Sequence, residues 1–546
     1  MIGVAVRDVE RAAASELFEL CKTPWEFWQD AKAYEVIVAS GNAPKSDAPL
    51  VIEFNARLDT GARPKAATVL RHGARRIPIY GSAATFPEST CHLVEDEQSK
   101  QPVLQAQRID DAKTRIQVGY SLFGEVRCLL ESGQPAEWSR TPTLELHIAL
   151  LRELITRAGV AFVEIPPVPD GYSFIGCLSH DIDHPLFRNH RFDHTELGFV
   201  YRALVGTPLD VLRGKKPPRE IAANWAAILR LPFVHLGWAK DAWSEFDRYV
   251  AIESGLRSTF FFIPQGNYAG KKVDGPAPTK RASRYEPSEL AAQMKKIAAS
   301  GSEVGLHGLD AWIDPARARH ERERIAGVSG TVPVGIRMHW LYFDQNSPAI
   351  LDDAGFSYDS TVGYNETVGY RAGTSQAYRP PGTKNLLELP LTLMDTALFY
   401  PDYLNLGPQE AVAIIDELLG NAAIFGGALT INWHDRSIMP ERNWDETYRL
   451  IVRRLIDAHA WCPTCADAVA WFRKRRAASV VITSSSRDGI SVKARAAEAD
   501  SLPPLTIRVY KPCEKSDSEC ISMRTPADAV NLRLINEKEL MIVFTK

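Results

Sequence analysis

The sequence predicts an α/β protein whose central segment, residues 172–476, folds as a largely parallel sheet or (β/α) barrel. Apolar runs of strand length alternate in this segment with helical patterns. Polar residues able to bind a metal or transfer a proton follow several of the runs. The C-terminal ends of parallel strands meet at that point in such folds. We predict an N-terminal α+β domain (residues 1–165) before it and a small all-β domain (residues 479–546) after it.

The N-terminal segment mixes two kinds of pattern. Helical periodicity covers residues 9–34 and 144–158, and short β-like runs occur at 67–70 and 77–80. No convergent set of His, Cys, Asp and Glu stands out in it, so we assign it no role. The proline-rich connector at residues 164–171 predicts a domain boundary.

The central segment supplies most of the predicted elements. Its candidate strands are residues 173–178, 258–263, 303–306, 334–336 and 428–432, and its candidate helices are residues 241–254, 289–299, 315–326 and 408–419. Residues 189–231 read as a helical excursion from this repeat. The cations of Arg473–Arg476 are expected at a solvated helix end.

The C-terminal segment contains five short strand-like runs separated by turn residues, at 479–483, 490–493, 506–510, 530–534 and 540–544. This pattern predicts the small β domain, which we expect to supply no catalytic group. Cys513 and Cys520 could join Cys462 and Cys465 in a zinc knuckle, but their spacing is wrong for one and buried thiols are favoured.

Composition narrows the function classes. The chain has 546 residues, 45% hydrophobic and 24% charged, with a formal net charge of -3. These values are typical of a soluble globular protein and give no basic footprint for nucleic acid. Charged residues occur within the first ten positions, before any apolar stretch as long as the core of a signal peptide. No window resembles a transmembrane segment. We therefore expect a cytoplasmic protein.

Chemically active side chains follow four of the candidate strands: His180, Asp181 and Asp183; His307; Arg337 and His339; His434 and Asp435. A zinc-type ion takes two imidazoles and a carboxylate and keeps a position open for water. A further carboxylate can accept the proton of that water, and a further histidine can protonate a leaving nitrogen. The set therefore indicates a metal hydrolase.

The order of these segments resembles the polysaccharide deacetylase family, the NodB-homology metal-dependent N-deacetylases. The matching segments are Ser179–Asp183, Arg257–Phe262, Glu303–His307, Arg337–Trp340, Gly355–Ser360 and Leu429–His434. The resemblance covers roughly residues 172–475 and implies a distorted (β/α) barrel deacetylase domain. It also implies a divalent metal cofactor, with Zn²⁺ expected.

The resemblance assigns roles residue by residue. It implies that Asp181 is the general base, Arg337 orients that base, and His434 is the general acid. It makes Asp183 and His307 metal ligands, but the family's second metal histidine falls on Ala311, beside Asp310. His339 replaces the proline of the Arg-x-Pro motif, so we predict a rearranged site in which His339 is the second metal histidine.

The resemblance implies removal of the N-acetyl group from an amino sugar in a polysaccharide or in a lipid- or nucleotide-linked precursor. Aromatic residues that could stack on the sugar are Trp340, Tyr342, Tyr364 and Trp433. Two alternatives stay open: a hydrolase of non-sugar amides or imides with the same fold, and a catalytically silent carbohydrate-binding protein.

Overall fold

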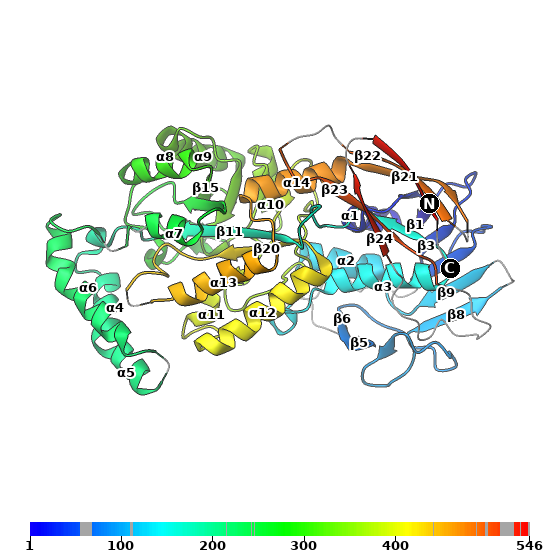
Figure 1. Cartoon of the computed structure of the whole chain (residues 1–546), viewed down its shortest axis with the longest axis horizontal. Coiled ribbons are helices and arrows are strands. Elements are labelled where there is room, and N and C mark those ends of the chain that lie inside the picture. The colour runs from blue at the N-terminus through cyan, green and yellow to red at the C-terminus, as the bar shows by residue number, and fades with distance from the viewer. Residues whose placement is uncertain are drawn as a thin grey trace.

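The computed structural model describes the chain except residues 55–67, 110–112, 215, 242, 245, 441, 487–488, 497–500, 514–528, 535–536 and 544–546. The molecule is elongated (Figure 1), with the central segment in one half and the N- and C-terminal segments in the other. None of the helices within the described ranges combines the length and apolarity needed to cross a membrane.

An eight-stranded sheet organises the central segment, with every neighbouring pair of strands parallel. In spatial order the strands are β18 (Leu387–Glu388), β17 (Tyr358–Asp359), β16 (Gly335–Met338), β15 (Glu303–Gly308), β12 (Ser258–Phe262), β11 (Ile175–Ile182), β20 (Ala428–Asn432) and β19 (Leu393–Met394). β11 and β12 are buried along their whole length, as continuous apolar strands covered on both faces should be.

The two edges of this sheet are connected by a short segment. A flat sheet of eight strands would separate its outer strands by about 34 Å, but only five residue steps, reaching at most about 18 Å, join the end of β18 to β19. Between these strands the backbone N–H of Leu391 donates to Val362 O at 3.0 Å, and that of Thr392 donates to Thr430 O at 3.0 Å. The segment thus bonds to the chain after β17 on one side and to β20 on the other, each next to an edge strand, and the predicted distorted (β/α) barrel is confirmed.

Helices surround the barrel strands (Figure 1). They are α7 (Phe246–Ile252), α8 (Ala291–Ala299), α9 (Pro315–Ser329), α10 (Ser347–Asp353), α11 (Asp395–Phe399), α12 (Pro408–Phe425), α13 (Asp445–Asp457) and α14 (Cys465–Ala477). The ends of α9 follow from its local sequence. The Asp314 side chain caps its first turn, Pro315 is its first residue, and Gly330 ends it with a left-handed φ of 78°.

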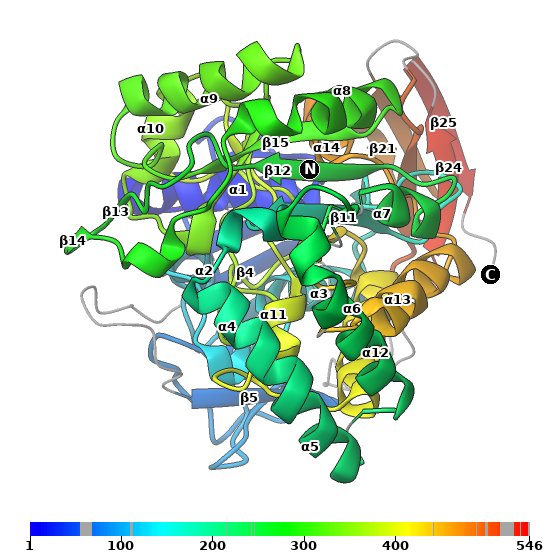
Figure 2. The same ribbon diagram turned by 90° about the vertical axis from the view of Figure 1, so that its left-hand side faces the viewer.

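The helical excursion projects from the barrel as an arm (Figures 1 and 2). It consists of α4 (His194–Tyr201), a π-helical turn (Arg202–Gly206), α5 (Thr207–Leu212) and α6 (Arg219–His235). The hairpin β13 (Lys271–Lys272) and β14 (Gly275–Pro276) is a second, smaller projection.

The N-terminal segment holds a six-stranded sheet in the order β2 (Trp25–Phe27), β1 (Ile2–Ala5), β3 (Val36–Ser40), β4 (Leu50–Phe54), β9 (Thr114–Val118) and β8 (Leu104–Arg108), parallel except for the last pair. Its other elements are α1 (Arg11–Cys21), β5 (Thr68–His72), β6 (Arg75–Ile79), β7 (Glu95–Asp96), α2 (Leu122–Glu131) and α3 (Thr143–Arg157). The helix expected over residues 9–34 ends at Cys21, because Lys22 adopts a left-handed φ of 45° and Pro24 follows.

The C-terminal strands belong to two sheets. β21 (Ser479–Ser485), β22 (Gly489–Arg495) and β25 (Glu537–Val543) form one, and β23 (Leu505–Tyr510) and β24 (Ala529–Leu534) form the other together with β10 (Phe162–Glu164) of the N-terminal segment. Their apolar side chains share one core with residues of β11 and β12, including Ile175 and Phe261. The division of the chain into three domains stays a prediction, as does the end of the last run at Phe544, outside the described residues.

Arg475 links these segments from inside the molecule. Contrary to the expectation of a solvated helix end, its side chain is buried. The guanidinium donates to Ile165 O at 2.8 Å, to Leu20 O at 2.8 Å and to Gln376 Oε1 at 3.1 Å. A sequence pattern of four cations could not reveal that one of them turns inward to two backbone carbonyls and a glutamine side chain.

Replacing Arg475 with Met is expected to lower the free energy of unfolding by roughly 3 kcal/mol, because three buried acceptors lose their donors. Urea denaturation followed by circular dichroism measures the change. Arg453→Met, an exposed arginine on α13, is the matched control and should change stability little. Equal stability of the two variants would contradict the proposed linking role of Arg475.

Candidate functional site

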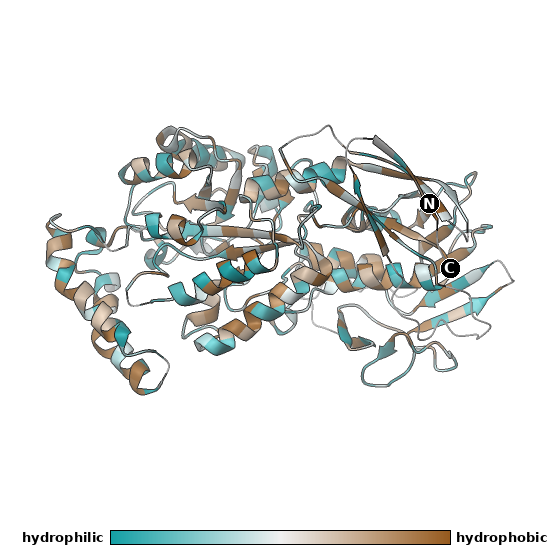
Figure 3. Ribbon diagram, viewed as in Figure 1, coloured by the Kyte–Doolittle hydropathy of each residue, from teal (hydrophilic) through white to brown (hydrophobic). Residues whose placement is uncertain are grey.

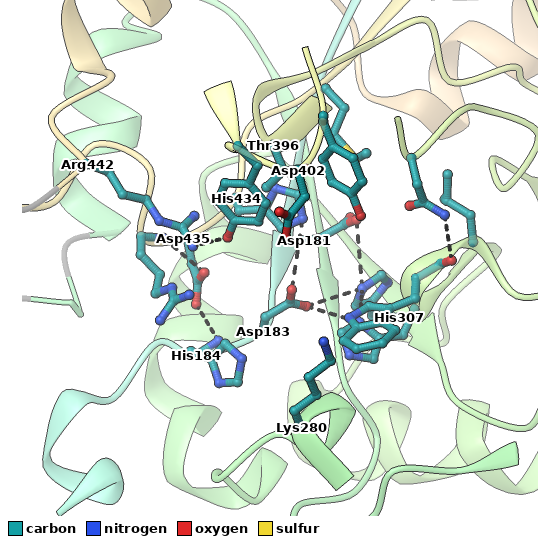
Figure 4. Close-up of a pocket in the computed structure, with 18 of the residues that line it drawn as sticks. Asp181, Asp183, His184, Lys280, His307, Thr396, Asp402, His434, Asp435 and Arg442 are labelled. Carbon is teal, nitrogen blue, oxygen red and sulfur yellow. Dashed lines mark hydrogen bonds and ion pairs between the residues drawn. The ribbon is translucent and has the colours of Figure 1, made fainter. Parts of the chain in front are cut away.

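A cavity of about 550 Å³ opens at the C-terminal ends of the barrel strands. It is lined by the predicted site residues Asp181, Asp183, His307, His339 and His434. Figure 4 shows Asp181, Asp183, His307 and His434 converging, with Lys280, Asp402 and Arg442 around them. The parallel barrel accounts for this convergence, since every strand delivers the residue at its C-terminal end to the same rim.

Asp183, His307 and His339 form a compact triad. Asp183 Oδ1 lies 3.3 Å from His307 Nε2 and 3.3 Å from His339 Nδ1, and the two ring nitrogens lie 3.0 Å apart. Ligands of a tetrahedral zinc ion, at about 2.0–2.1 Å from the metal, stand about 3.3 Å from one another. The triad therefore has the spacing of one face of a metal coordination shell, and it includes the predicted replacement ligand His339.

The outer hydrogen bonds of the triad fix the tautomers of both imidazoles. His307 Nδ1 contacts the carbonyl of Arg337 at 3.0 Å and His339 Nε2 contacts the carbonyl of Arg281 at 2.9 Å. A carbonyl oxygen only accepts, so each of these ring nitrogens carries the proton. Burial lowers the pKa of His339 to about 4, so this ring is neutral at pH 7.

With the protons on the outer nitrogens, the two inner nitrogens face each other 3.0 Å apart. Asp183 Oδ1 adds a third acceptor, buried and without a hydrogen-bond donor. Three acceptors aimed at one point repel one another, and a bound cation converts that repulsion into attraction. The donor set of two nitrogens and one carboxylate oxygen, each imidazole held by a carbonyl on its far side, fits a divalent metal.

His339 sits in a distorted turn. The two residues after it, Trp340 and Leu341, have left-handed φ values of 58° and 55° although neither is glycine. Arg281 holds this turn from both sides, because its guanidinium donates to His339 O at 2.8 Å while its carbonyl accepts from the imidazole. The strained turn positions the imidazole of His339. The resembled motif has a proline at this position, and proline has no imidazole.

The position beside the missing histidine does not contribute to the triad. Asp310 accepts hydrogen bonds from the Tyr268 hydroxyl at 2.5 Å and from Arg317 at 3.0 Å, and Ala311 is buried in the apolar core. The Asp310 carboxylate is thus satisfied away from the cavity.

Asp181 is held by two donors. Arg337 Nη1 donates to Asp181 Oδ1 at 3.0 Å and Asn432 Nδ2 donates to Oδ2 at 2.7 Å. Arg337 is itself fully buried and donates to Ser179 Oγ and Ser360 Oγ as well. Burial alone would raise the pKa of Asp181, but nearby His307 and Arg337 outweigh it and lower that pKa. The side chain is therefore an oriented carboxylate beside the triad.

His434 forms a dyad with Asp395. Its Nδ1 lies 2.6 Å from Asp395 Oδ1, and its backbone N–H donates to Asp395 Oδ2 at 2.7 Å. The other ring nitrogen, Nε2, points toward Asp183 Oδ2 at 3.9 Å. Burial lowers the pKa of His434, but Asp395 and Asp183 raise it more strongly, to about 10. His434 is thus a protonated imidazole aimed at the triad.

The remaining histidines of the first motif separate in the structure. His180 lies outside the cavity, since its ring contacts Trp433 O and Glu253 Oε1, both at 2.8 Å. His184 and Asp435 line the cavity, and burial raises the pKa of Asp435 to about 7. His190 pairs with Asp193 at 2.8 Å.

Of the aromatic residues expected to contact a sugar, Trp340 and Tyr342 line the cavity together with Tyr400 and Tyr403. Trp433 is fully buried in the core, and the Tyr364 hydroxyl donates to Gln134 O at 2.6 Å. Sequence proximity to a motif was a poor guide here, because residues next to a strand end alternate between the cavity and the core.

Sequence reasoning missed Asp395, Asn432 and Arg281. Asp395 follows the two-residue strand β19, which is too short to leave a periodic pattern. Asn432 stands directly in the last matched motif, two residues before His434, and its position at a strand end was a usable signal. Nothing local marked Arg281, which contacts His339 through both its backbone carbonyl and its guanidinium.

No family model and no curated protein matches the chain. Several solved structures show partial similarity. A crystal structure described as a putative polysaccharide deacetylase from Mycobacterium smegmatis is 19% identical over 56% of this chain and 93% of that chain, with a TM-score of 0.33. Puue allantoinase is 15% identical over 56% of this chain and 92% of that chain, with a TM-score of 0.34.

Agd3, described as a novel carbohydrate deacetylase, is 10% identical over 100% of this chain and 98% of that chain, with a TM-score of 0.38. Polysaccharide deacetylases, the family that the motifs resemble, are thus among the similar structures.

Proposed function

We propose that this protein is a metal-dependent hydrolase of the polysaccharide deacetylase type that removes the N-acetyl group from an amino sugar. The observation that carries the proposal is the convergence of three inward-facing acceptors, Asp183, His307 and His339, between an oriented carboxylate and a protonated imidazole. A binding module needs neither of the two proton-transfer groups.

The donor set favours Zn²⁺, which is commonly held by two imidazoles and one carboxylate with a position left open. When bound, such an ion supplies Lewis acidity to the amide carbonyl and lowers the pKa of a water molecule. His307 and His339 hold their lone pairs inward because their far-side nitrogens donate to Arg337 O and Arg281 O.

Asp181 would accept the proton of the attacking water. Its two oxygens receive hydrogen bonds from Arg337 and Asn432, which fix its orientation and keep it ionised. His434 would protonate the departing nitrogen, because its Nε2 faces the triad while Asp395 binds its other nitrogen. One group gives up a proton where the other takes one, as amide hydrolysis requires.

The choice of an acetylated sugar rests on the family resemblance and on the lining of the cavity. Trp340, Tyr342, Tyr400 and Tyr403 offer aromatic faces, and Lys280, Asp402 and Arg442 offer charged groups for hydroxyls. The volume of about 550 Å³ is of the size that accommodates a small ligand. A polysaccharide and a lipid- or nucleotide-linked precursor are the candidate substrates.

The direct test is acetate release. Purified protein loaded with Zn²⁺ is expected to release acetate from at least one N-acetylhexosamine oligomer, glycolipid precursor or nucleotide sugar, and a chelator should abolish the release. Metal binding without acetate from a broad panel would favour the non-sugar amidase, and no metal binding at all would favour the silent binding protein.

Asp395→Asn is expected to shift the alkaline limb of the pH profile of kcat/KM to lower pH. The general acid must be protonated, and Asp395 raises the pKa of His434, so its neutralisation lets His434 lose its proton at a lower pH. Asp402→Asn, which removes an exposed carboxylate at the same cavity, is the control. Identical alkaline limbs in wild type and Asp395→Asn would remove the dyad from the proposal.

A further inference from the structure

Exposed apolar side chains are concentrated on the projecting arm, defined here as residues 191–240. Among the described residues, 12 of the 25 exposed large apolar side chains lie in it. The four most exposed are Leu212 at 83%, Trp238 at 76%, Phe192 at 75% and Leu229 at 74%. Figure 3 shows the brown stretches of α5 and α6 on the part of the molecule that projects farthest.

The exposed residues of α6 form a stripe. Ala222, Trp225, Ala226, Leu229 and Phe233 all face solvent, at the spacing of one face of an α-helix. Charged residues would normally occupy this face of a surface helix.

The opposite face of α6 contains a polar residue in the interior. Asn224 is fully buried and donates to Thr207 Oγ1 on α5 at 2.8 Å. The inner face also buries Val234 and packs Leu231 partly against the core, so α6 is apolar on both sides and packing within the arm does not explain its apolar exterior.

The other half of the arm repeats the pattern. α4, the π-helical turn and α5 form one continuous helix, on which Leu197, Tyr201, Leu204 and Leu212 are exposed. Two helices thus present large side chains to solvent, and two of these are Tyr201 and Trp225, residue types that favour the boundary between water and lipid.

The arm is also basic. It contains eight Lys and Arg against four Asp and Glu, a net charge of +4 in a chain whose net charge is -3, so the rest carries -7. A second copy of the arm would carry the same net charge of +4, so the two arms would repel each other. An anionic surface complements the charge, and a lipid headgroup layer also receives the apolar stripes.

We infer that the arm docks on the surface of an anionic lipid bilayer, with its apolar side chains inserted among the headgroups and acyl chain ends. Thr195 and Arg202 of the arm also line the cavity of the candidate site. Docking would therefore hold the mouth of the cavity close to the membrane surface. The inference depends on exposure and charge of the arm, not on the activity proposed above.

Vesicle co-sedimentation of the full-length protein tests the inference. Wild type is expected to bind vesicles of phosphatidylcholine with about a third phosphatidylglycerol, and to bind them less as salt is raised. Trp225→Glu with Leu229→Glu should lower the partition coefficient roughly tenfold or more, because two inserted side chains become charged. Both residues are exposed, so the variant should fold.

Ile424→Glu is the matched control, since this exposed apolar residue lies on α12 outside the arm. Its binding should equal that of wild type. No binding of wild type, or equal loss in the control, would overturn the inference. So would light scattering that shows a lipid-free wild-type dimer dissociated by the arm variant, since the arm would then be a self-association surface.

Discussion

His339→Ala is expected to lose bound zinc and nearly all activity. His339 Nδ1 is one of three inward-facing acceptors, and it lies 3.0 Å from His307 Nε2 and 3.3 Å from Asp183 Oδ1. Removal of an outer-shell partner alone typically costs about 10–100-fold in metal affinity, and loss of a ligand should cost more. Metal content after dialysis and acetate release measure the two effects.

The variant His320→Ala provides the control, because His320 is an exposed histidine on α9 outside the cavity. Circular dichroism should show native secondary structure in both variants. If His339→Ala retained the wild-type metal content, the rearranged site would be wrong. Asp310 and His184 would then be the candidates for the missing metal ligand. A combined Asp310→Ala variant would then separate these two residues.

The barrel was predictable because its strands are long apolar runs. All five candidate strands of the central segment form in the structure, with shifts of at most a few residues. The elements that close the barrel, β17, β18 and β19, are two residues each and left no strand pattern, although β17 lies in the matched segment Gly355–Ser360. The sequence therefore predicted the class of fold, whereas the closure depends on hydrogen bonds at Leu391 and Thr392 that no local signal encodes.

Only part of the candidate site was predictable from the sequence. The triad and its neighbours could be proposed because each residue ends a strand and parallel strands bring such ends together. The groups that orient them were harder to predict. Asp395 and the carbonyl of Arg281 act on His434 and His339 through contacts between segments 39 and 58 residues apart. Only the folded chain brings those partners together.

Asp181→Asn is expected to keep the metal and reduce turnover by about 10²- to 10⁴-fold, the usual contribution of positioned proton transfer. The amide preserves the shape of the side chain but cannot accept the proton of water at neutral pH. Asp183, His307 and His339 remain intact, so zinc content should match wild type. His434→Asn should fall in the same range of turnover, because it removes the proton donor for the departing nitrogen.

Two further variants distinguish the loss of the Asp181 carboxylate from the loss of a residue that orients it. Asn432→Ala removes one of the two side-chain donors to Asp181, so its turnover should lie between those of wild type and Asp181→Asn. Asp457→Asn alters an exposed carboxylate on α13, outside the cavity, and should stay close to wild type. Wild-type turnover in Asp181→Asn would exclude it as the base, whereas loss of zinc in that variant would mean that the carboxylate supports the metal.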